Sequence, residues 1–464
     1  MRHLAPASAL VLALLATAPA RAQNCNGTST GLVPLVELGS GLHQGFPGGL
    51  FPGGGVLRPA AHDADGLRIA RTVTPLDGAG NPSAEGRIVL LSIGMSNCTQ
   101  EFSTWVPIAN ADPQKNPRVQ LVDGAQGGQT AATIANPNAN FWTVVQQRLT
   151  TAGATVNQVQ AVWLKEANAQ PTQPFPSHTQ IMLPQLVQIC QNLKTKYPNC
   201  RLVFVSGRTY GGYATTTLNP EPYAYETSFA FQWLVRDQIG GDPALNYDPG
   251  RGPVVAPYAT WGPYLWADGL TPRCDGLIWR CQDFASDGTH PAPGAGLGRA
   301  KVAQLLNGFF RTNGLARPWY LAAGSGSTCT AAAAAAECYG RGLAGTGGIV
   351  PLLAASTPPA LPSAGPFAVQ LTGAAPGAPG VFVAGSARFD VGQAPLLGGW
   401  LLVQPTLAWP ALTDGLGRAS LAFGPLPALA AACGAVLHFQ AGVVDAGAVQ
   451  GVSLTPGLAV RLGS

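Results

Sequence analysis

The sequence contains few charged residues: Lys, Arg, Asp and Glu together make up only 10% of its 464 positions. The net charge at pH 7 is +4, and the basic residues form no cluster. Nucleic acids and anionic membranes are bound through dense groups of Lys and Arg, so both are poor candidates as partners. The sequence also lacks a run of about 18 apolar residues, which a membrane-spanning helix needs. We therefore expect no nucleic-acid binding and no membrane span.

The first 22 residues are typical of a secretory signal peptide. Arg2 provides the positive start, residues 10–16 are apolar, and Ala20-Arg21-Ala22 resembles a small-residue cleavage site. The apolar part is too short to cross a bilayer. We therefore expect residues 1–22 to be removed and the mature protein to be secreted, either outside the cell or into a periplasm.

Metal-site spacings are also missing. The nine cysteines include no CxxC pair, and no closely spaced histidine pair accompanies them, so we expect neither a metal site nor a cofactor. In an exported chain, cysteines are more simply interpreted as disulfides. Neighbours in sequence suggest three pairs, and three cysteines remain without an assigned partner. The expected pairs are Cys190/Cys200, Cys274/Cys281 and Cys329/Cys338, and the unassigned cysteines are Cys25, Cys98 and Cys433.

Several patterns divide the chain. Residues 23–86 are rich in Gly and Pro without periodicity, which predicts a coat of turns over a catalytic domain spanning residues 23–322. From residue 88 onward, short apolar runs alternate with helical patterns, which favours an α/β fold with a parallel sheet covered by helices on both faces. The expected strands are 88–93, 119–123, 160–165 and 201–206, and the expected helices are 99–106, 140–151, 179–197, 223–239 and 296–311.

The last part of the chain has a different character. Residues 323–348 are low in complexity and are interpreted as an Ala/Gly-rich linker. Residues 349–464 contain short strand-like runs separated by Gly and Pro, with few helical patterns between them. This predicts an antiparallel β-sandwich as an accessory domain. The expected strands are 367–371, 381–384, 400–404, 420–423, 436–440 and 454–462.

One strand end carries the main chemical signal. The apolar run 88–93 is followed by Gly94 and then by Ser96, which places a serine at the carboxyl edge of the sheet and near a helix N-terminus. A serine becomes a nucleophile when an imidazole takes its proton, and the imidazole needs an acceptor on its other nitrogen. Asp287 and His290 stand three residues apart and can meet in a turn. Ser96, His290 and Asp287 therefore form a candidate catalytic triad.

Oxyanion donors are available at the ends of three expected strands. The candidates are the backbone N–H of Ser96, a backbone N–H of Gly127 or Gly128, and the side-chain amide of Asn168. Such donors stabilise the negative charge that develops on a carbonyl oxygen during acyl transfer. We expect them to meet at one edge of the sheet.

The order Gly-x-Ser, Gly, Asn and Asp-x-x-His resembles the SGNH/GDSL hydrolases. Gly94-Met95-Ser96-Asn97 is similar to the GQSN motif of their carbohydrate acetylesterase branch, which includes sialate O-acetylesterase-like enzymes, and Glu166-Ala167-Asn168 resembles the end of its WxQGEx(N/D) motif. The resemblance covers about residues 88–311. It implies a flavodoxin-like three-layer fold, the triad and the oxyanion hole named above. Met95 and Leu164-Lys165 depart from the family's pattern.

The substrate is less well defined by the sequence. Asn97 and Glu166 in the two motifs, and Trp261 and Trp266 in a loop between catalytic blocks, are candidates to contact it; the tryptophans could equally pack in the core. We predict a secreted serine esterase acting on acyl esters, with acetyl favoured, of a carbohydrate or other extracellular polymer. The alternatives are a lipase or short-chain carboxylesterase, an acyl transferase, and a non-catalytic surface or glycan-binding protein. The α/β-hydrolase fold is rejected because Cys98 replaces the last Gly of its Gly-x-Ser-x-Gly motif.

Overall fold

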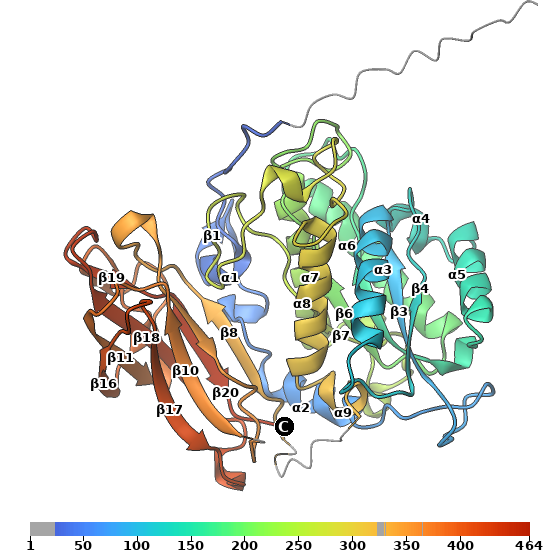
Figure 1. Cartoon of the computed structure of the whole chain (residues 1–464). Coiled ribbons are helices and arrows are strands. Elements are labelled where there is room, and N and C mark those ends of the chain that lie inside the picture. The colour runs from blue at the N-terminus through green and yellow to red at the C-terminus, as the bar shows by residue number, and fades with distance from the viewer. Residues whose placement is uncertain (1–23, 323–328, 330, 364) are drawn as a thin grey trace, which may run out of the picture.

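The computed structural model describes residues 24–322, 329, 331–363 and 365–464. The predicted signal peptide and residues 323–328 of the predicted linker lie outside this part of the chain. An α/β region (residues 24–322) stands beside a C-terminal β region (the described residues from 331 onward), at the right and left of Figure 1 respectively. No helix in the described ranges is long and apolar enough to cross a membrane.

A five-stranded parallel sheet forms the centre of the α/β region, in the order β4-β3-β5-β6-β7. All strands except β4 are buried along their whole length, as expected for a sheet covered on both faces. Counted from the first parallel strand the order is 2-1-3-4-5, a doubly wound order that places ligands where the strand order reverses. That point lies between β3 and β5. The strands are β3 (Ile88–Gly94), β4 (Val119–Asp123), β5 (Val159–Lys165), β6 (Leu202–Ser206) and β7 (Tyr258–Trp261).

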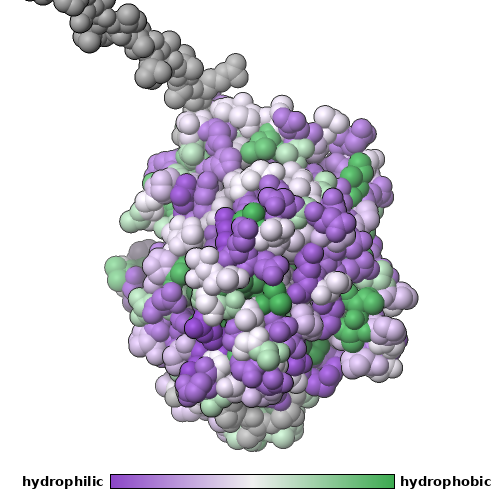
Figure 2. Space-filling view, turned by 90° about the vertical axis from the view of Figure 1, so that its right-hand side faces the viewer, coloured by the Kyte–Doolittle hydropathy of each residue, from purple (hydrophilic) through white to green (hydrophobic). Residues whose placement is uncertain are grey.

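Helices cover this sheet on both sides. α3 packs against α8, while α6 packs against α7 and α4 (Figure 1). The surface over α4 and α5 is mainly hydrophilic, with hydrophobic residues in small separate spots (Figure 2). The helices are α1 (Leu35–Leu38), α2 (Ala60–Ala70), α3 (Ser96–Asn110), α4 (Ala131–Ala135), α5 (Asn140–Thr151), α6 (Ser177–Lys196), α7 (Tyr223–Ile239), α8 (Gly298–Thr312) and α9 (Arg317–Tyr320).

Several elements of this region were not predicted, and β7 and α2 are the most informative of them. β7 is only four residues long, and the prolines at 257 and 263 that flank it obscure its apolar pattern. α2 lies within the segment predicted to be a coat of turns, which also contains the two-residue strands β1 (Leu42–His43) and β2 (Phe46–Pro47). Gly66 weakens the helical pattern of α2, but a Cβ there would lie 2.6 Å from the Tyr258 ring. The glycine therefore allows α2 to pack directly on β7.

Two antiparallel sheets form most of the C-terminal β region. One has the order β16-β11-β18-β20-β8, with β19 also paired to β18, and the other has the order β17-β10-β9. Apolar residues of β10, β11, β18 and β20 form a shared core between them. The strands are β8 (Ala335–Tyr339), β9 (Leu352–Ala355), β10 (Pro366–Thr372), β11 (Pro379–Gly385), β12 (Ala387–Arg388), β13 (Pro395–Leu396), β14 (Gly399–Trp400), β15 (Val403–Gln404), β16 (Leu407–Leu412), β17 (Ala419–Pro425), β18 (Val436–Val444), β19 (Val452–Leu454) and β20 (Gly457–Arg461).

The two regions are tied together at several points. β8 belongs to the larger sheet, so the prediction that residues 323–348 form only a linker is wrong for this segment. Arg461 of β20 forms a buried ion pair with Asp63 of α2, and Arg341 reaches Glu37 at 3.1 Å. These contacts fix the accessory strands against the α/β region.

The predicted disulfide pairs are wrong. Cys190 and Cys200 are buried free thiols, as is Cys98. The other four candidates form disulfides, but each with a partner distant in sequence, because a disulfide requires Cα atoms about 4.4–6.8 Å apart in the folded chain. The bonds found, with Cα separations of 5.3, 5.8 and 5.3 Å, are Cys25–Cys281, Cys274–Cys338 and Cys329–Cys433. Three disulfides are typical of a protein from an oxidising compartment.

Candidate active site

The turn after β3 depends on a glycine. A Cβ on Gly94 would lie 2.2 Å from the Lys165 carbonyl oxygen and 2.6 Å from the Cys98 Cβ, so no larger residue fits. This close approach lets the chain turn straight from β3 into α3, whose first residue is Ser96. The backbone N–H of Ser96 therefore stands in the first turn of a helix, where no acceptor exists within the helix itself. The Ser96 side chain is partly exposed.

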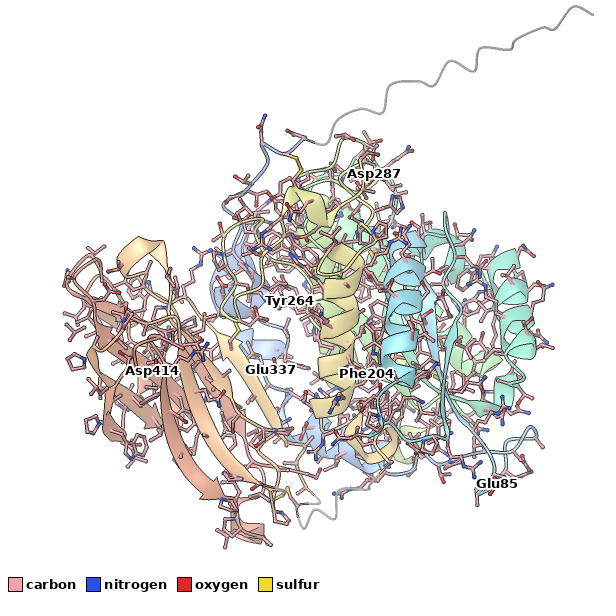
Figure 3. All side chains as sticks on the ribbon, viewed as in Figure 1. Glu85, Phe204, Tyr264, Asp287, Glu337 and Asp414 are labelled. Carbon is pink, nitrogen blue, oxygen red and sulfur yellow. A yellow bond between two sulfur atoms is a disulfide. The ribbon has the colours of Figure 1, made fainter. Side chains whose placement is uncertain are left out.

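Ser96, His290 and Asp287 lie together at the carboxyl edge of the sheet; Figure 3 labels Asp287 at the top of the α/β region. The Ser96 Oγ is 2.7 Å from the His290 Nε2. The His290 Nδ1 forms a hydrogen bond with the Asp287 carboxylate, which also accepts the backbone N–H of His290 and of Thr289, both at 3.0 Å. The arrangement can pass a proton from the serine hydroxyl to an imidazole held in one orientation.

The loop that carries Asp287 and His290 also needs a glycine. Gly288 adopts a φ of 64°, and a Cβ there would lie 1.8 Å from the Tyr213 carbonyl oxygen. The turn therefore packs on the backbone of the segment after β6, and Thr215 N–H donates to the Asp287 carbonyl oxygen at 3.0 Å. This support keeps the turn in the conformation in which the Asp287 carboxylate reaches the His290 ring.

Electrostatics favour an ionised Asp287. Partial burial alone would raise the pKa of this carboxyl group, but hydrogen bonds from the His290 ring and from the His290 and Thr289 amides outweigh it, and the pKa lies below its ordinary value. A carboxylate that remains ionised can stabilise a positive charge on His290.

Asn97 was predicted to contact the substrate, but the structure places it in the interior. It is fully buried, and its Nδ2 donates to the Thr289 carbonyl oxygen at 2.9 Å. Asn97 therefore cannot contact substrate directly. It links the serine turn to the loop carrying His290, a positioning contact that the GQSN-like motif alone does not reveal.

The candidate oxyanion donors are only partly brought together. The Gln126 N–H donates to the Gly94 carbonyl oxygen at 2.9 Å and so ties the Gly-rich turn after β4 to the serine turn. A Cβ on Gly127 would lie 3.8 Å from the Ser96 Cβ, whereas nothing lies within 4 Å of the corresponding point on Gly128. Gly127 is therefore the closer of the two glycines to Ser96.

Asn168 stands at the end of β5, beside the same edge of the sheet. Its Nδ2 donates one hydrogen to the Gln185 Oε1 at 2.7 Å, and its Oδ1 accepts the Ala132 N–H at 3.2 Å. An amide NH₂ group has two hydrogens, so a second donor remains. Gln185, which orients this amide, was not predicted, because no motif marks a residue in the middle of α6.

The other three substrate-contact candidates are also buried. Glu166 is 0% exposed, Trp261 is 3% exposed and Trp266 is 0% exposed. The Trp261 Nε1 donates to the Leu50 carbonyl oxygen at 2.6 Å, and the Trp266 Nε1 donates to Glu221 at 2.8 Å. These side chains are parts of the core, and the prediction that they touch substrate is corrected.

A group of buried charges lies beneath the serine turn. Lys165, at the end of β5, donates to both carboxylate oxygens of Glu101 on α3, each at 2.6 Å. Arg208, which follows β6, is 3% exposed and donates to the Met95 Sδ at 3.4 Å. No group of three His, Cys, Asp or Glu residues within the described segments could hold a metal ion.

Comparisons with known proteins give only distant similarity. No family model matches the chain, and no curated protein matches it. Among solved structures, a salicylyl-acyltransferase from a tetracycline biosynthetic pathway is 13% identical with a TM-score of 0.27, over 50% of this chain and 55% of that one. This chain thus spans about half the length of that protein. An extracellular lipase from Streptomyces rimosus is 12% identical with a TM-score of 0.25, over 48% of this chain and 99% of that one. A carbohydrate acetylesterase from Xanthomonas citri is 11% identical with a TM-score of 0.25, over 79% of this chain and 78% of that one.

Proposed function

We propose that this protein is a secreted serine esterase of the SGNH type, with Ser96 as nucleophile, His290 as general base and Asp287 as its orienting partner. The observation that carries the proposal is the 2.7 Å contact between the Ser96 Oγ and the His290 Nε2, with Asp287 on the other imidazole nitrogen. The position of Ser96 beside the reversal point of a doubly wound sheet supports it.

The reaction follows from this geometry. The Ser96 Oγ attacks the ester carbonyl carbon while the His290 Nε2 takes the hydroxyl proton. The backbone N–H groups of Ser96 and Gly127 and the free amide hydrogen of Asn168 stabilise the oxyanion. The alcohol leaves with the proton from His290, and an acyl-enzyme remains. Water, deprotonated by His290, then attacks the acyl-enzyme, so that the carboxylic acid is released and Ser96 is restored.

The proposed substrate is an acyl ester, with acetyl favoured, on a carbohydrate or another extracellular polymer. The similarity of Gly94-Met95-Ser96-Asn97 and Glu166-Ala167-Asn168 to acetylesterase motifs supports this choice. The three disulfides support export.

Hydrolysis assays test the proposal. Purified protein is given p-nitrophenyl acetate, butyrate and octanoate, and acetylated xylan. We expect fastest release from the acetate, and Ser96→Ala should lower kcat at least about 10³-fold. Ser103→Ala is the matched control, because Ser103 is an exposed serine on the same helix. Hydrolysis unchanged in Ser96→Ala would refute the mechanism, and a preference for the octanoate would favour a lipase.

A further inference from the structure

A buried cation lies directly beneath the serine turn. Arg208 is 3% exposed, and its Nη1 donates to the Sδ of Met95, the residue before Ser96. Its Nε is buried without a hydrogen-bond partner, and no ion pair to Arg208 is formed within the described residues. A buried guanidinium without a contacting carboxylate is costly, so its retention beside the nucleophile needs a physical reason.

Four carboxyl groups act on Arg208 electrostatically, but none neutralises it by contact. They come from four separate segments: Glu101 on α3, Glu166 after β5, Glu221 before α7, and Asp287 in the histidine loop. Glu101 is paired with Lys165, and Asp287 is paired with His290.

The remaining two carboxyl groups hold their protons readily. Burial raises the pKa of Glu166 well above its ordinary value, and its Oε1 has no hydrogen-bond partner. Burial also raises the pKa of Glu221 to about 7. Burial therefore favours the protonated form of both groups. Lys165 and Glu101 cancel one another, and the ionised Asp287 is bound to His290, so the positive charge of Arg208 lies under the serine turn without a carboxylate in contact.

We propose that Arg208 is a positioning and electrostatic residue for the reaction at Ser96: it holds Met95 and supplies a fixed positive charge that complements the negative charge of the tetrahedral intermediate. A preorganised charge at a water-poor position stabilises a developing oxyanion without reorganisation during the reaction. The proposed role is indirect: Arg208 acts through its contact with Met95, the residue before Ser96. This inference rests on the proposed esterase function.

The test uses the full-length secreted protein, with p-nitrophenyl acetate as substrate and three variants. Arg208→Met removes the charge and should lower kcat about 10–100-fold, less than the loss of a direct oxyanion donor, with KM changed less than about twofold. Because the charge also acts on the triad, the acid limb of the pH–rate profile should move to higher pH. Arg208→Lys keeps a point charge and should restore kcat to within about fivefold of wild type.

Arg317→Met is the matched control. Arg317, on α9, also has a buried guanidinium nitrogen without a hydrogen-bond partner. α9 follows the C-terminal end of α8, whereas the loop that carries His290 precedes the N-terminal end of that helix (Figure 1). Its replacement should affect stability alone. If Arg208→Met matched Arg317→Met in kcat and in pH profile, the inference would be wrong.

A second readout decides the question even if Arg208→Met fails to fold. A buried ammonium loses its proton far more readily than a guanidinium. Arg208→Lys should therefore show an extra fall in kcat at alkaline pH that wild type lacks, and an unchanged alkaline limb would overturn the proposal. If wild type and Ser96→Ala hydrolysed the ester equally, the esterase function itself would fail; loss in Ser96→Ala with no effect of the Arg208 variants would refute this inference alone.

Discussion

Breaking the buried ion pair between Lys165 and Glu101 should destabilise the protein strongly. Lys165 is 1% exposed and Glu101 is 0% exposed in their side chains, and the Lys165 Nζ lies 2.6 Å from both carboxylate oxygens. Burial lowers the pKa of Lys165 and raises that of Glu101, so each charge depends on the other. Lys165→Met leaves a carboxylate buried without a partner, which should cost about 3–5 kcal/mol of unfolding free energy.

Removing both charges should be much less harmful. A well-packed apolar pair is often as stable as a buried ion pair of similar volume, so the double variant Lys165→Met/Glu101→Met should lie within about 1 kcal/mol of wild type. The exposed pair Arg118–Glu85, with side chains 36% and 84% exposed, is the matched control. Arg118→Met should cost less than about 1 kcal/mol.

Denaturant unfolding followed by tryptophan fluorescence measures these free energies, because eight of the ten tryptophans lie in the α/β region. With Glu101→Met added as the second single variant, wild type, the two single variants and the double variant form a double-mutant cycle whose coupling term isolates the pair. A cost below about 1 kcal/mol for Lys165→Met, or a double variant less stable than the Lys165 single variant, would refute the reasoning.

Three further predictions concern the linked loops, the pH dependence and the disulfides. Asn97→Ala leaves the buried Thr289 carbonyl oxygen without its donor, so stability should fall by about 1–3 kcal/mol and kcat should fall more than KM changes; steady-state kinetics showing an effect on KM alone would contradict a positioning role. Folding raises the pKa of Glu221 from 4.5 to about 7. Between these pH values the folded chain keeps a proton that the unfolded chain has lost, so the free energy of unfolding should decrease as pH rises. The decrease should be at most about 1.4 kcal/mol per pH unit. Glu221→Gln should flatten the slope in denaturant unfolding between pH 5 and pH 8 relative to wild type, and an unaltered slope would exclude Glu221 as its source. Peptide mapping by mass spectrometry without reduction should find three free thiols and no bond between sequence neighbours; the expected bonds are Cys25–Cys281, Cys274–Cys338 and Cys329–Cys433.

The central strands could be predicted from the sequence because strands buried on both faces need continuous apolar runs. For this reason the sequence predicts both β3 and the position of its end at Gly94. β7 was missed because a strand of only four residues, with prolines on both sides, gives too short a pattern. α2 was missed because Gly66 weakens its helical pattern, and its close packing on Tyr258 cannot be read from the local sequence.

The site was partly predictable for a similar reason. A strand-end serine and an Asp-x-x-His turn are local features, and topology brings them together. Burial is not a local feature, so Trp261 and Trp266 could not be told apart from exposed aromatic residues. Disulfide partners also depend on the folded chain, since Cys338 meets Cys274 only after β8 joins the larger sheet. Asn97 and Arg208 contact partners that lie more than 100 residues away in sequence, so no local pattern reveals these contacts.

The most direct test of the proposed catalytic triad is covalent labelling of the folded protein with a fluorophosphonate, followed by tandem mass spectrometry of its peptides. A hydroxyl activated by an imidazole attacks the phosphorus and displaces fluoride, which leaves a stable adduct on the serine oxygen. We predict a single adduct on Ser96 that is absent from His290→Ala and present in Ser103→Ala. An unlabelled wild-type protein, or an adduct that persists in His290→Ala, would contradict the account.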